Sequence, residues 1–429
     1  MTKFQALEWQ RNIYLQGFTG KKPLISPDWV KLEQDAVAKM SPEATSYIIG
    51  GAGLQKTMDN NRTGFDAYRI VPKVLQNVEN RDTSTEILGV KMPSPFWLCP
   101  IGVSEMVHPE ADLAIAKAAA QTGIPYVFSN QASIKMETCA EAMGDSPRYF
   151  QLYWSRSRDL VAHFVQRAEA CGCKGIVLTL DTTFLGWRTR DLDLGFLPFL
   201  QGKGIAQYTS DLVFQKMIDD ELKKPKDAVD FKPKITFSTI KNLITAVNRY
   251  PSSDGFFTKL RSNRPMTAVR LFTGFYTNPA LTWDDLSFLR QHTQLPIFLK
   301  GILHPENAKK AVDYGMDGIV VSNHGGRQVD GSIGAIEALP EVVKAVNNQV
   351  PIVLDSGIRG GADVFKALAL GANAVGLGRP YIYGLALNGQ QGVHDVVRHL
   401  QADFELTMSL AGCRNVGEIT SETILKNKY

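Results

Sequence analysis

A histidine and an arginine lie three positions apart directly after a short apolar run, in the stretch VSNHGGRQ (residues 321–328). An imidazole is the natural general base near neutral pH, and a guanidinium can bind a carboxylate through two parallel hydrogen bonds. His324 and Arg327 therefore suit an acid substrate that must lose a proton or a hydride. The alternative is a core histidine with satisfied hydrogen bonds, but a core position rarely has an arginine and two glycines beside it.

Further polar side chains follow other apolar runs. Lys300 ends PIFLK, where its ammonium either neutralises an anionic ligand, forms a Schiff base or extends to solvent. Asp181 follows GIVLTL and could orient a histidine and stabilise its protonated form, and Arg188 could be a second carboxylate clamp. Gln151 and Tyr153 alternate in RYFQLY, so both side chains lie on one face of a strand.

Two glycine-rich stretches with an arginine predict a phosphate site. They are DSGIRGG (residues 355–361) and GLGRP (residues 376–380). Glycines let backbone amides approach an anion, and Arg359 and Arg379 add positive charge. Tight turns with surface ion pairs are the alternative, but barrel enzymes often bind phosphate in the loops after their seventh and eighth strands.

Eight short runs rich in β-branched and apolar residues must position these side chains. Alanine-rich amphipathic stretches such as ADLAIAKAAAQTG separate them. The alternation predicts an α/β fold, a closed parallel (β/α)8 TIM barrel, with the chemistry at the C-terminal ends of the strands. A doubly wound sheet is the alternative, but no GxGxxG follows the first run. The runs are residues 95–99, 124–129, 148–153, 175–180, 296–300, 318–322, 351–356 and 373–378.

One interval, about residues 195–282, interrupts this rhythm between the fourth and fifth runs. Because the loops after barrel strands lie at the catalytic end, we expect this insertion to act as a lid over the active site. For its charged middle, residues 219–234, a solvated decoration or an oligomer contact is the preferred interpretation. The insertion also contains a helical pattern with one apolar face, formed by Phe237, Ile240, Leu243, Ile244 and Val247.

Residues 1–90 are expected to form a helical segment that packs on the barrel of residues 91–429. Ser26-Pro27-Asp28 and Ser41-Pro42-Glu43 each have the pattern of an N-cap followed by proline at the first helical position. Gly50-Gly51 should end the second of these helices, which places Tyr47 in its last turn. No histidine precedes His108, and this excludes a bis-histidine haem domain.

Composition indicates a globular protein with a small-molecule ligand. Hydrophobic residues make up 44% and charged residues 21%, and the net charge of +4 is not gathered into a basic stripe that would favour nucleic acid or a membrane surface. Five scattered cysteines, no signal-peptide core and no SKL ending predict a cytoplasmic protein with reduced thiols. No candidate metal cluster emerges, because His304 and Glu306 lie together without further ligands.

Taken together, the strand ends resemble the FMN-dependent 2-hydroxy acid oxidase and dehydrogenase family. The resemblance implies the barrel fold, FMN as cofactor, a small 2-hydroxy acid and O2 as substrates, and a homo-oligomer, most often a tetramer. Six stretches carry it in this order: FQLYW, LTLDTTFLGWRTRDLD, FLKG, SNHGGRQVDG, DSGIRGGADVFKALALGA and GLGRP.

The resemblance also implies a role for each matching residue. His324 would take the hydroxyl or α proton, Asp181 would stabilise the imidazolium, and Lys300 would lie by N1 and the C2 carbonyl of the flavin. The substrate carboxylate or hydroxyl would be bound by Arg188, Arg327, Tyr47 and Tyr153. The cofactor would be held by Pro100, Ile101, Gly102, Ser129, Gln151, Thr179, Lys300, Ser322, Asp355, Gly357, Arg359, Gly378 and Arg379.

Within the family, FLPFLQGKGIAQYTSDLVFQK, YLQGFTG and Gly102, expected beside the flavin N5, resemble the lactate 2-monooxygenase branch. This implies oxidative decarboxylation of L-lactate to acetate, CO2 and water. The alternative within the family is an oxidase that releases the 2-oxo acid and H2O2. Outside it, a phosphate-barrel isomerase would not need both Arg188 and Arg327, and a silent phosphate-binding barrel would not need His324 and Lys300.

Overall fold

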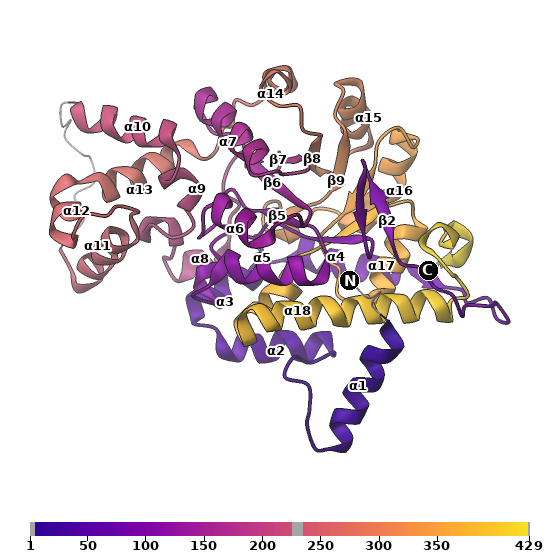
Figure 1. The fold of residues 1–429 in the computed structure, drawn as a ribbon. Coiled ribbons are helices and arrows are strands. Elements are labelled where there is room, and N and C mark those ends of the chain that lie inside the picture. The colour runs from indigo at the N-terminus through magenta and orange to yellow at the C-terminus, as the bar shows by residue number, and fades with distance from the viewer. Residues whose placement is uncertain (1–4, 225–234, 428–429) are drawn as a thin grey trace.

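The computed structural model describes residues 5–224 and 235–427, and its centre is a closed barrel of eight parallel strands (Figure 1). Each predicted run forms one barrel strand, and β11 pairs with β4 to close the ring. The predicted (β/α)8 TIM barrel is therefore confirmed. The strands are β4 (Phe96–Leu98), β5 (Tyr126–Phe128), β6 (Arg148–Tyr153), β7 (Ile176–Thr179), β8 (Ile297–Ile302), β9 (Gly318–Val321), β10 (Ile352–Leu354) and β11 (Ala374–Leu377).

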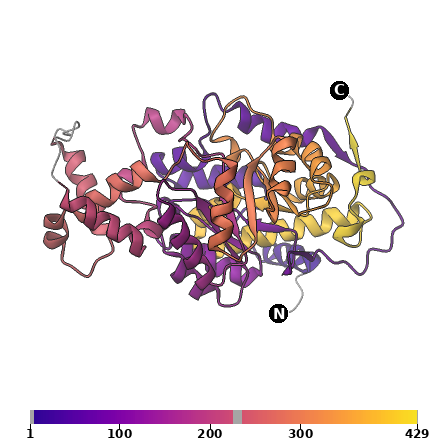
Figure 2. The same ribbon diagram turned by 90° about the horizontal axis from the view of Figure 1, so that it is seen from above.

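Helices surround the barrel because each strand is followed by an amphipathic segment that buries its apolar face on the sheet (Figure 2). The predicted helix at ADLAIAKAAAQTG, for example, ends at Gly123, whose φ of 74° suits glycine. The outer helices are α5 (Ala111–Thr122), α6 (Met136–Met143), α7 (Arg158–Ala170), α14 (Leu286–His292), α15 (Pro305–Asp313), α16 (Ala335–Val346), α17 (Gly361–Ala369) and α18 (Arg379–Leu410).

The barrel interior is filled by side chains and is closed at one end by a hairpin. The rings of Trp97, Tyr149 and Phe298 pack with centroids 4.9 to 5.9 Å apart. The hairpin of β2 (Thr85–Ile87) and β3 (Val90–Met92) adds Ile87 and Met92 to this cluster. Because the hairpin directly precedes β4, it covers the N-terminal ends of the strands and leaves the C-terminal ends for a site.

The N-terminal segment contains α1 (Ala6–Phe18), α2 (Trp29–Lys39), α3 (Pro42–Ile49) and α4 (Lys56–Asp66), then β1 (Tyr68–Ile70), which pairs with β12 (Ile424–Lys426). The caps predicted for α3 are confirmed, because Ser41 caps its start and Gly50 follows its end. The prediction of Ser26 as the cap of α2 was wrong. The Asp28 carboxylate accepts hydrogen bonds from the Val30 and Lys31 amides, and a carboxylate is favoured at the positive end of the helix dipole.

The described residues of the insertion after β7 form six α-helices, of which α10–α13 project to the side of the barrel beside α7 (Figure 1). The predicted apolar helix exists as α11, but Phe237 on its apolar face is 84% exposed, whereas Val247 is buried. Of the charged middle, residues 225–234 lie outside the described residues. The helices are α8 (Thr189–Asp193), α9 (Ala206–Thr209), α10 (Leu212–Lys223), α11 (Phe237–Arg249), α12 (Phe256–Ser262) and α13 (Arg264–Phe275).

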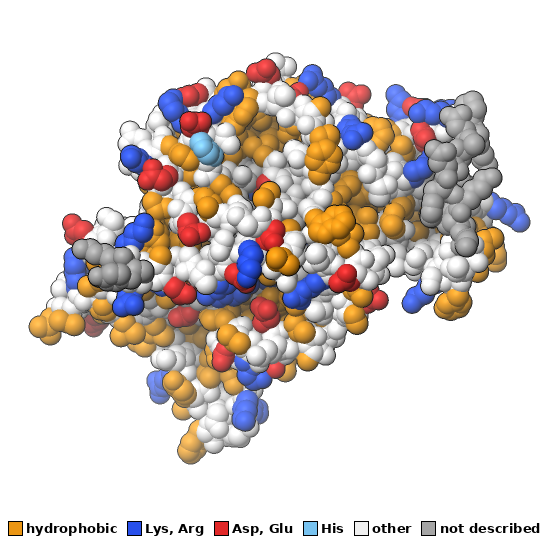
Figure 3. Space-filling view, turned by 180° about the vertical axis from the view of Figure 1, so that it is seen from behind, with side chains coloured by type: hydrophobic (Ala, Val, Ile, Leu, Met, Phe, Trp, Pro, Cys, Tyr) orange, Lys and Arg blue, Asp and Glu red, His pale blue; other side chains and the backbone are white. Residues whose placement is uncertain are grey.

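Two features of the helices concern the contact of the protein with solvent and membranes. In Figure 3, α1 projects at the lower edge of the molecule with hydrophobic side chains on its surface, and its last residue, Phe18, is 92% exposed. Among the helices of residues 5–224 and 235–427, none combines the length and the apolar character that crossing a bilayer requires.

Phe298→Ala should destabilise the barrel by about 3 to 5 kcal/mol, because it removes a fully buried ring and leaves a cavity among Trp97 and Tyr149. Urea unfolding at equal cofactor occupancy measures the loss. Phe18→Ala is the matched control and should change the free energy of unfolding by less than about 0.5 kcal/mol. Equal effects of the two substitutions would contradict the described interior.

Candidate active site

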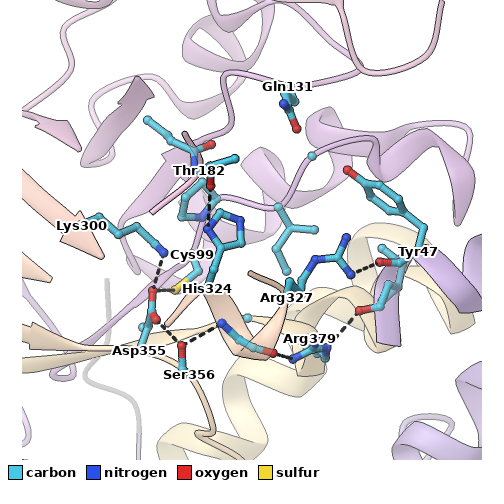
Figure 4. A pocket seen from close by; sticks show the side chains of 18 of the residues that line it. Tyr47, Cys99, Gln131, Thr182, Lys300, His324, Arg327, Asp355, Ser356 and Arg379 are labelled. Atoms are coloured by element: carbon cyan, nitrogen blue, oxygen red, sulfur yellow. Dashed lines mark hydrogen bonds and ion pairs between the residues drawn. The ribbon is translucent and has the colours of Figure 1, made fainter. Parts of the chain in front are cut away.

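A cavity of about 120 Å³ lies at the C-terminal ends of the barrel strands (Figure 4). All eight strands, or the loops that follow them, contribute to its wall, and the end of α3 adds Tyr47 and Ile48. The cavity therefore gathers residues that are far apart in the sequence, as the barrel topology requires.

His324 occupies the turn after β9 and has a partner on each ring nitrogen. Its Nδ1 donates a hydrogen bond to Oδ1 of Asp181 at 2.8 Å, and its Nε2 lies 3.4 Å from the hydroxyl of Tyr153. Its backbone φ of 59° is uncommon for a residue with a side chain, and such strain concentrates at functional sites. Because Asp181 accepts the proton on Nδ1, Nε2 is the nitrogen available as a proton acceptor.

Burial favours the neutral form of the His324 imidazole. Burial lowers the pKa of His324 below its ordinary value, although the Asp181 carboxylate acts in the opposite direction. Burial raises the pKa of Asp181, but its interactions with His324 and Lys300 outweigh this effect and lower the pKa to about 2. A proton that reaches Nε2 would create an imidazolium directly beside a permanent carboxylate.

Two half-buried arginines bind the C-terminal end of α3 through backbone carbonyl groups. Arg327 donates to the carbonyl oxygens of Tyr47 and Gly50, and its guanidinium lies 5.0 Å from the centroid of the Tyr47 ring. Arg379 donates to the carbonyl oxygens of Gly50 and Gly325. Among the described residues, no carboxylate lies within ion-pair distance of either guanidinium. Burial lowers the pKa of Arg327 to about 9 and that of Arg379 to about 10, so both stay charged at pH 7.

Arg188 lies next to Arg327 and is 7% exposed. Its Nε donates to the carbonyl oxygen of Arg327, and its Nη2 donates to Oε1 of Gln328, both at 3.4 Å. Arg188, Arg327 and His324 line the same cavity. An anion that enters it meets positive charge that the protein leaves uncompensated.

Lys300 projects from β8 into the cavity and is fixed by two oxygens. Its Nζ donates to Oγ of Ser322 at 2.8 Å and lies 3.3 Å from Oδ2 of Asp355. Burial by itself lowers the pKa of Lys300, but Asp355 and Asp181 raise it above its ordinary value. The amine is therefore a permanent ammonium, which favours anion stabilisation over the Schiff-base alternative.

A chain of hydrogen bonds orients one polar wall. Oγ of Ser129 donates to Oε1 of Gln151 at 3.3 Å, and Nε2 of Gln151 donates to Oγ1 of Thr179 at 3.1 Å. The backbone amide of Asn130 also donates to Oε1 of Gln151 at 3.3 Å. These bonds hold the Gln151 amide in one orientation at the cavity surface, where it can meet a polar ring edge.

The glycine-rich loops after β10 and β11 form the end of the cavity near α4. Gly357 has a φ of 112°, and a Cβ there would lie 2.2 Å from the carbonyl oxygen of Asn61, so only glycine fits. Arg359, Gly378 and Arg379 line the same end. The phosphate dianion of FMN fits this donor set, because it would supply an anionic partner for the half-buried Arg379, which has no carboxylate partner among the described residues.

The structure brings most of the predicted site residues to the cavity surface. Asp181, Ser129, Thr179 and Ser322 lie one layer behind and contact His324, Gln151 or Lys300. The predicted residues that line the cavity are Tyr47, Pro100, Ile101, Gly102, Gln151, Tyr153, Arg188, Lys300, His324, Arg327, Asp355, Gly357, Arg359, Gly378 and Arg379.

Other lining residues were missed from the sequence. Cys99 ends one predicted strand, and Gln131 lies two residues after another, so the strand-end rule could have found both. Thr182 follows Asp181 at another strand end. Among the described residues of the insertion beyond residue 195, Tyr276 lines the cavity. Nothing in its local sequence identifies it as a cavity residue. The role of the insertion as a lid stays a prediction.

Comparison with known proteins gives three kinds of agreement. The FMN-dependent dehydrogenase family matches residues 36–426. An L-lactate oxidase of Lysinibacillus sphaericus (strain C3-41) is 39% identical over 396 residues, 92% of each chain. An FMN-dependent alpha-hydroxy acid dehydrogenase of Schizosaccharomyces pombe is 38% identical over 416 residues, 96% of this chain and 94% of that one. A crystal structure of mandelate oxidase has a TM-score of 0.73 at 31% identity, over 93% of this chain and 98% of that one.

These matches cover the barrel, both glycine-rich loops and the turn that carries His324 and Arg327. They confirm the family, the fold and the cofactor that the resemblance implied. The chain therefore belongs to the FMN-dependent dehydrogenase family and catalyses the FMN-dependent oxidation of a 2-hydroxy acid.

Proposed function

We propose that this protein oxidises L-lactate with O2 and converts it to acetate, CO2 and water. The observation that carries the proposal is the presence of Arg188, Arg327 and His324 on one cavity wall, where charge for a carboxylate lies beside a neutral imidazole. Several relatives are named L-lactate oxidase, from Lysinibacillus, Lactobacillus and Nostoc, which supports lactate as the substrate.

The substrate carboxylate binds to the uncompensated guanidinium groups of Arg327 and Arg188. A guanidinium presents paired donors that match the two oxygens of a carboxylate. Burial raises the pKa of the Tyr47 hydroxyl above its ordinary value and that of Tyr153 to about 12, so both phenols stay protonated and donate hydrogen bonds. Together these groups orient the hydroxy acid with its reacting carbon toward His324.

The proton leaves the substrate through Nε2 of His324. Asp181 holds the opposite nitrogen at 2.8 Å, which keeps the imidazole in the tautomer with a free Nε2 and stabilises the imidazolium that forms. This arrangement serves removal of either the hydroxyl or the α proton. Tyr153, 3.4 Å from the same nitrogen, positions the substrate oxygen next to the base.

The remaining residues of the cavity would hold FMN. Arg359, Arg379 and the glycines of the two loops would bind its phosphate, Asp355 would bind the ribityl chain, and Gln151 and Lys300 would bind the ring. When bound, FMN accepts the two electrons that the 2-hydroxy acid loses. The permanent charge of Lys300 favours negative charge that develops beside it.

The decarboxylating outcome requires that the 2-oxo acid stays in the cavity until peroxide forms. Pyruvate and H2O2 then give acetate, CO2 and water, and the atoms balance. The lactate 2-monooxygenase signature at Gly102 and in residues 196–216 supports this outcome. The alternative, an oxidase that releases pyruvate and H2O2, is favoured by the names of the lactate oxidase relatives. A cytoplasmic homotetramer stays a prediction.

The purified protein should be yellow, with a flavin absorption spectrum that anaerobic lactate bleaches.

Arg379→Gln should weaken FMN binding by about tenfold or more, because it removes a charged partner of the phosphate. Equilibrium dialysis with fluorescence of the released FMN measures the affinity. A colourless protein that FMN cannot reconstitute would contradict the cofactor site.

Activity should fall on the acid side as His324 takes up a proton. Because burial lowers the pKa of His324, kcat/KM for lactate should stay constant as the pH falls to 6.5 and decline only below that pH.

The Asp181 carboxylate raises the pKa of His324 and stabilises the imidazolium. Asp181→Asn should therefore shift the acidic decline of kcat/KM to lower pH and reduce kcat by roughly 10²-fold to 10⁴-fold. The exposed Asp193→Asn is the matched control. An acid limb above pH 6.5, or one that Asp181→Asn leaves in place, would disprove the assigned base.

Acetate should be the main aerobic product, with one O2 consumed for each lactate. Gly102→Ala should raise the share of pyruvate and H2O2, because an added Cβ meets Gln131 at 2.9 Å and disturbs this part of the cavity wall. Product analysis with oxygen uptake measures both. Stoichiometric pyruvate and peroxide from the unmodified enzyme would assign it to the oxidase alternative.

A further inference from the structure

Gln131 is a buried polar residue in the cavity wall, and the proposed function gives its side chain no role. It lies in the loop after β5, is 8% exposed, and its side chain is directed into the cavity (Figure 4). Its backbone is fixed, because its N–H donates to Oγ of Ser129 at 3.1 Å and its carbonyl accepts from the N–H of Val103 at 2.9 Å. Its side-chain amide has no hydrogen-bond partner among the described residues. A buried amide in this position is suited to a ligand.

Gly102 lets Gln131 approach the loop after β4. A Cβ at residue 102 would lie 2.9 Å from Cβ of Gln131, 3.0 Å from its carbonyl oxygen and 3.5 Å from its Oε1. The first of these distances is too short for a real contact, so alanine at 102 and the present position of Gln131 exclude each other. The identity of residue 102 therefore decides where the Gln131 amide lies.

One segment of the insertion, residues 204–208, contacts the loop after β5 from outside the cavity. We call this segment the clamp. The N–H of Ala206 donates to the carbonyl oxygen of Ala132 at 3.1 Å. The fully buried Tyr208 donates from its hydroxyl to Oδ1 of Asn130 at 2.7 Å. Gly204 has a φ of 68°, and a Cβ there would lie 3.0 Å from the carbonyl oxygen of Gln131. The clamp therefore contacts both sides of Gln131 in the sequence.

The clamp is itself rigid because it is part of the packed core of the insertion. The ring of Tyr208 contacts those of Phe164, Phe214 and Phe272, with centroids 4.8 to 5.5 Å apart. Phe164 belongs to α7 of the barrel, and the other two belong to α10 and α13 of the insertion. The position of Gln131 is thus coupled to the packing of helices that lie beside the barrel and away from the cavity.

We propose that Gln131 is a further residue that contacts the organic acid, and that the clamp holds it in position against Gly102. Its amide N–H donates a hydrogen bond to an oxygen of the bound acid. The arginines supply charge, which binds any carboxylate, whereas a neutral amide supplies one directed donor that suits the carbonyl oxygen of a 2-oxo acid. This inference rests on the proposed function, since it identifies a residue that retains the 2-oxo acid.

The experiment measures pyruvate binding to the oxidised holoenzyme by calorimetry, a readout that does not depend on turnover. Gln131→Leu keeps the volume and removes the amide, so it should weaken pyruvate binding by about tenfold and lower the ratio of acetate to pyruvate in aerobic turnover. Gln131→Asn, a shorter amide, should lie between Gln131→Leu and the unmodified enzyme. Equal pyruvate affinity in Gln131→Leu at full FMN occupancy would overturn the contact.

The clamp is tested by a matched pair of tyrosine variants. Tyr208→Phe removes the bond to Asn130, whereas Tyr250→Phe removes a bond of 2.8 Å to Gln215 that lies wholly inside the insertion. Tyr208→Phe should speed hydrogen exchange of residues 129–134 and weaken pyruvate binding, and Tyr250→Phe should do neither. Identical behaviour of the two variants would overturn the clamp.

Failure of the proposed function gives a different result from failure of this inference. Release of pyruvate and H2O2 by the unmodified enzyme would refute the decarboxylating outcome, but the loss of pyruvate affinity in Gln131→Leu would still be measured. Acetate formation together with unchanged pyruvate affinity in Gln131→Leu would refute only the role of Gln131.

Discussion

The site depends on half-buried positive charge that no carboxylate of residues 5–224 and 235–427 pairs with. Arg327 and Arg379 are held by carbonyl oxygens at the C-terminal end of α3, which fixes their position without neutralising them. Burial lowers the pKa of both, so the charge has a free-energy cost until an anion arrives. Under the proposed function, the phosphate of FMN and the carboxylate of the substrate are the anions that relieve this cost, and the two guanidinium groups lie close enough to share the Gly50 carbonyl as an acceptor.

The N-terminal segment is part of the cavity for the same reason, because it supplies the carbonyl groups that hold the two arginines. α3 is the element that the two arginines bind, and it adds the phenol of Tyr47 to the cavity. At a helix C-terminus the free carbonyl groups carry partial negative charge, which suits guanidinium groups. The barrel alone would leave Arg327 and Arg379 with neither these acceptors nor the Tyr47 ring above the Arg327 guanidinium.

Two neighbouring charge pairs lie at the cavity. Asp181 forms its hydrogen bond with His324, and Lys300 forms its ion pair with Asp355. The first pair leaves a neutral base, while the second leaves a permanent ammonium. The insertion reaches this chemistry indirectly, because Tyr208 contacts Asn130 and only Tyr276 among its described residues beyond 195 lines the cavity.

The sequence by itself determined the barrel and most of the cavity wall. Residues such as Lys300, His324 and Arg359 follow apolar runs, and a closed parallel barrel brings all strand ends to one face. Only the tertiary structure decided which of them touch, that Asp181 lies behind His324, and that Gln131 meets Gly102. It also decided that Phe237 is exposed although it belongs to an apolar helical face. Periodicity reports which residues share a face, whereas contact depends on what packs against that face, and distant parts of the chain supply it.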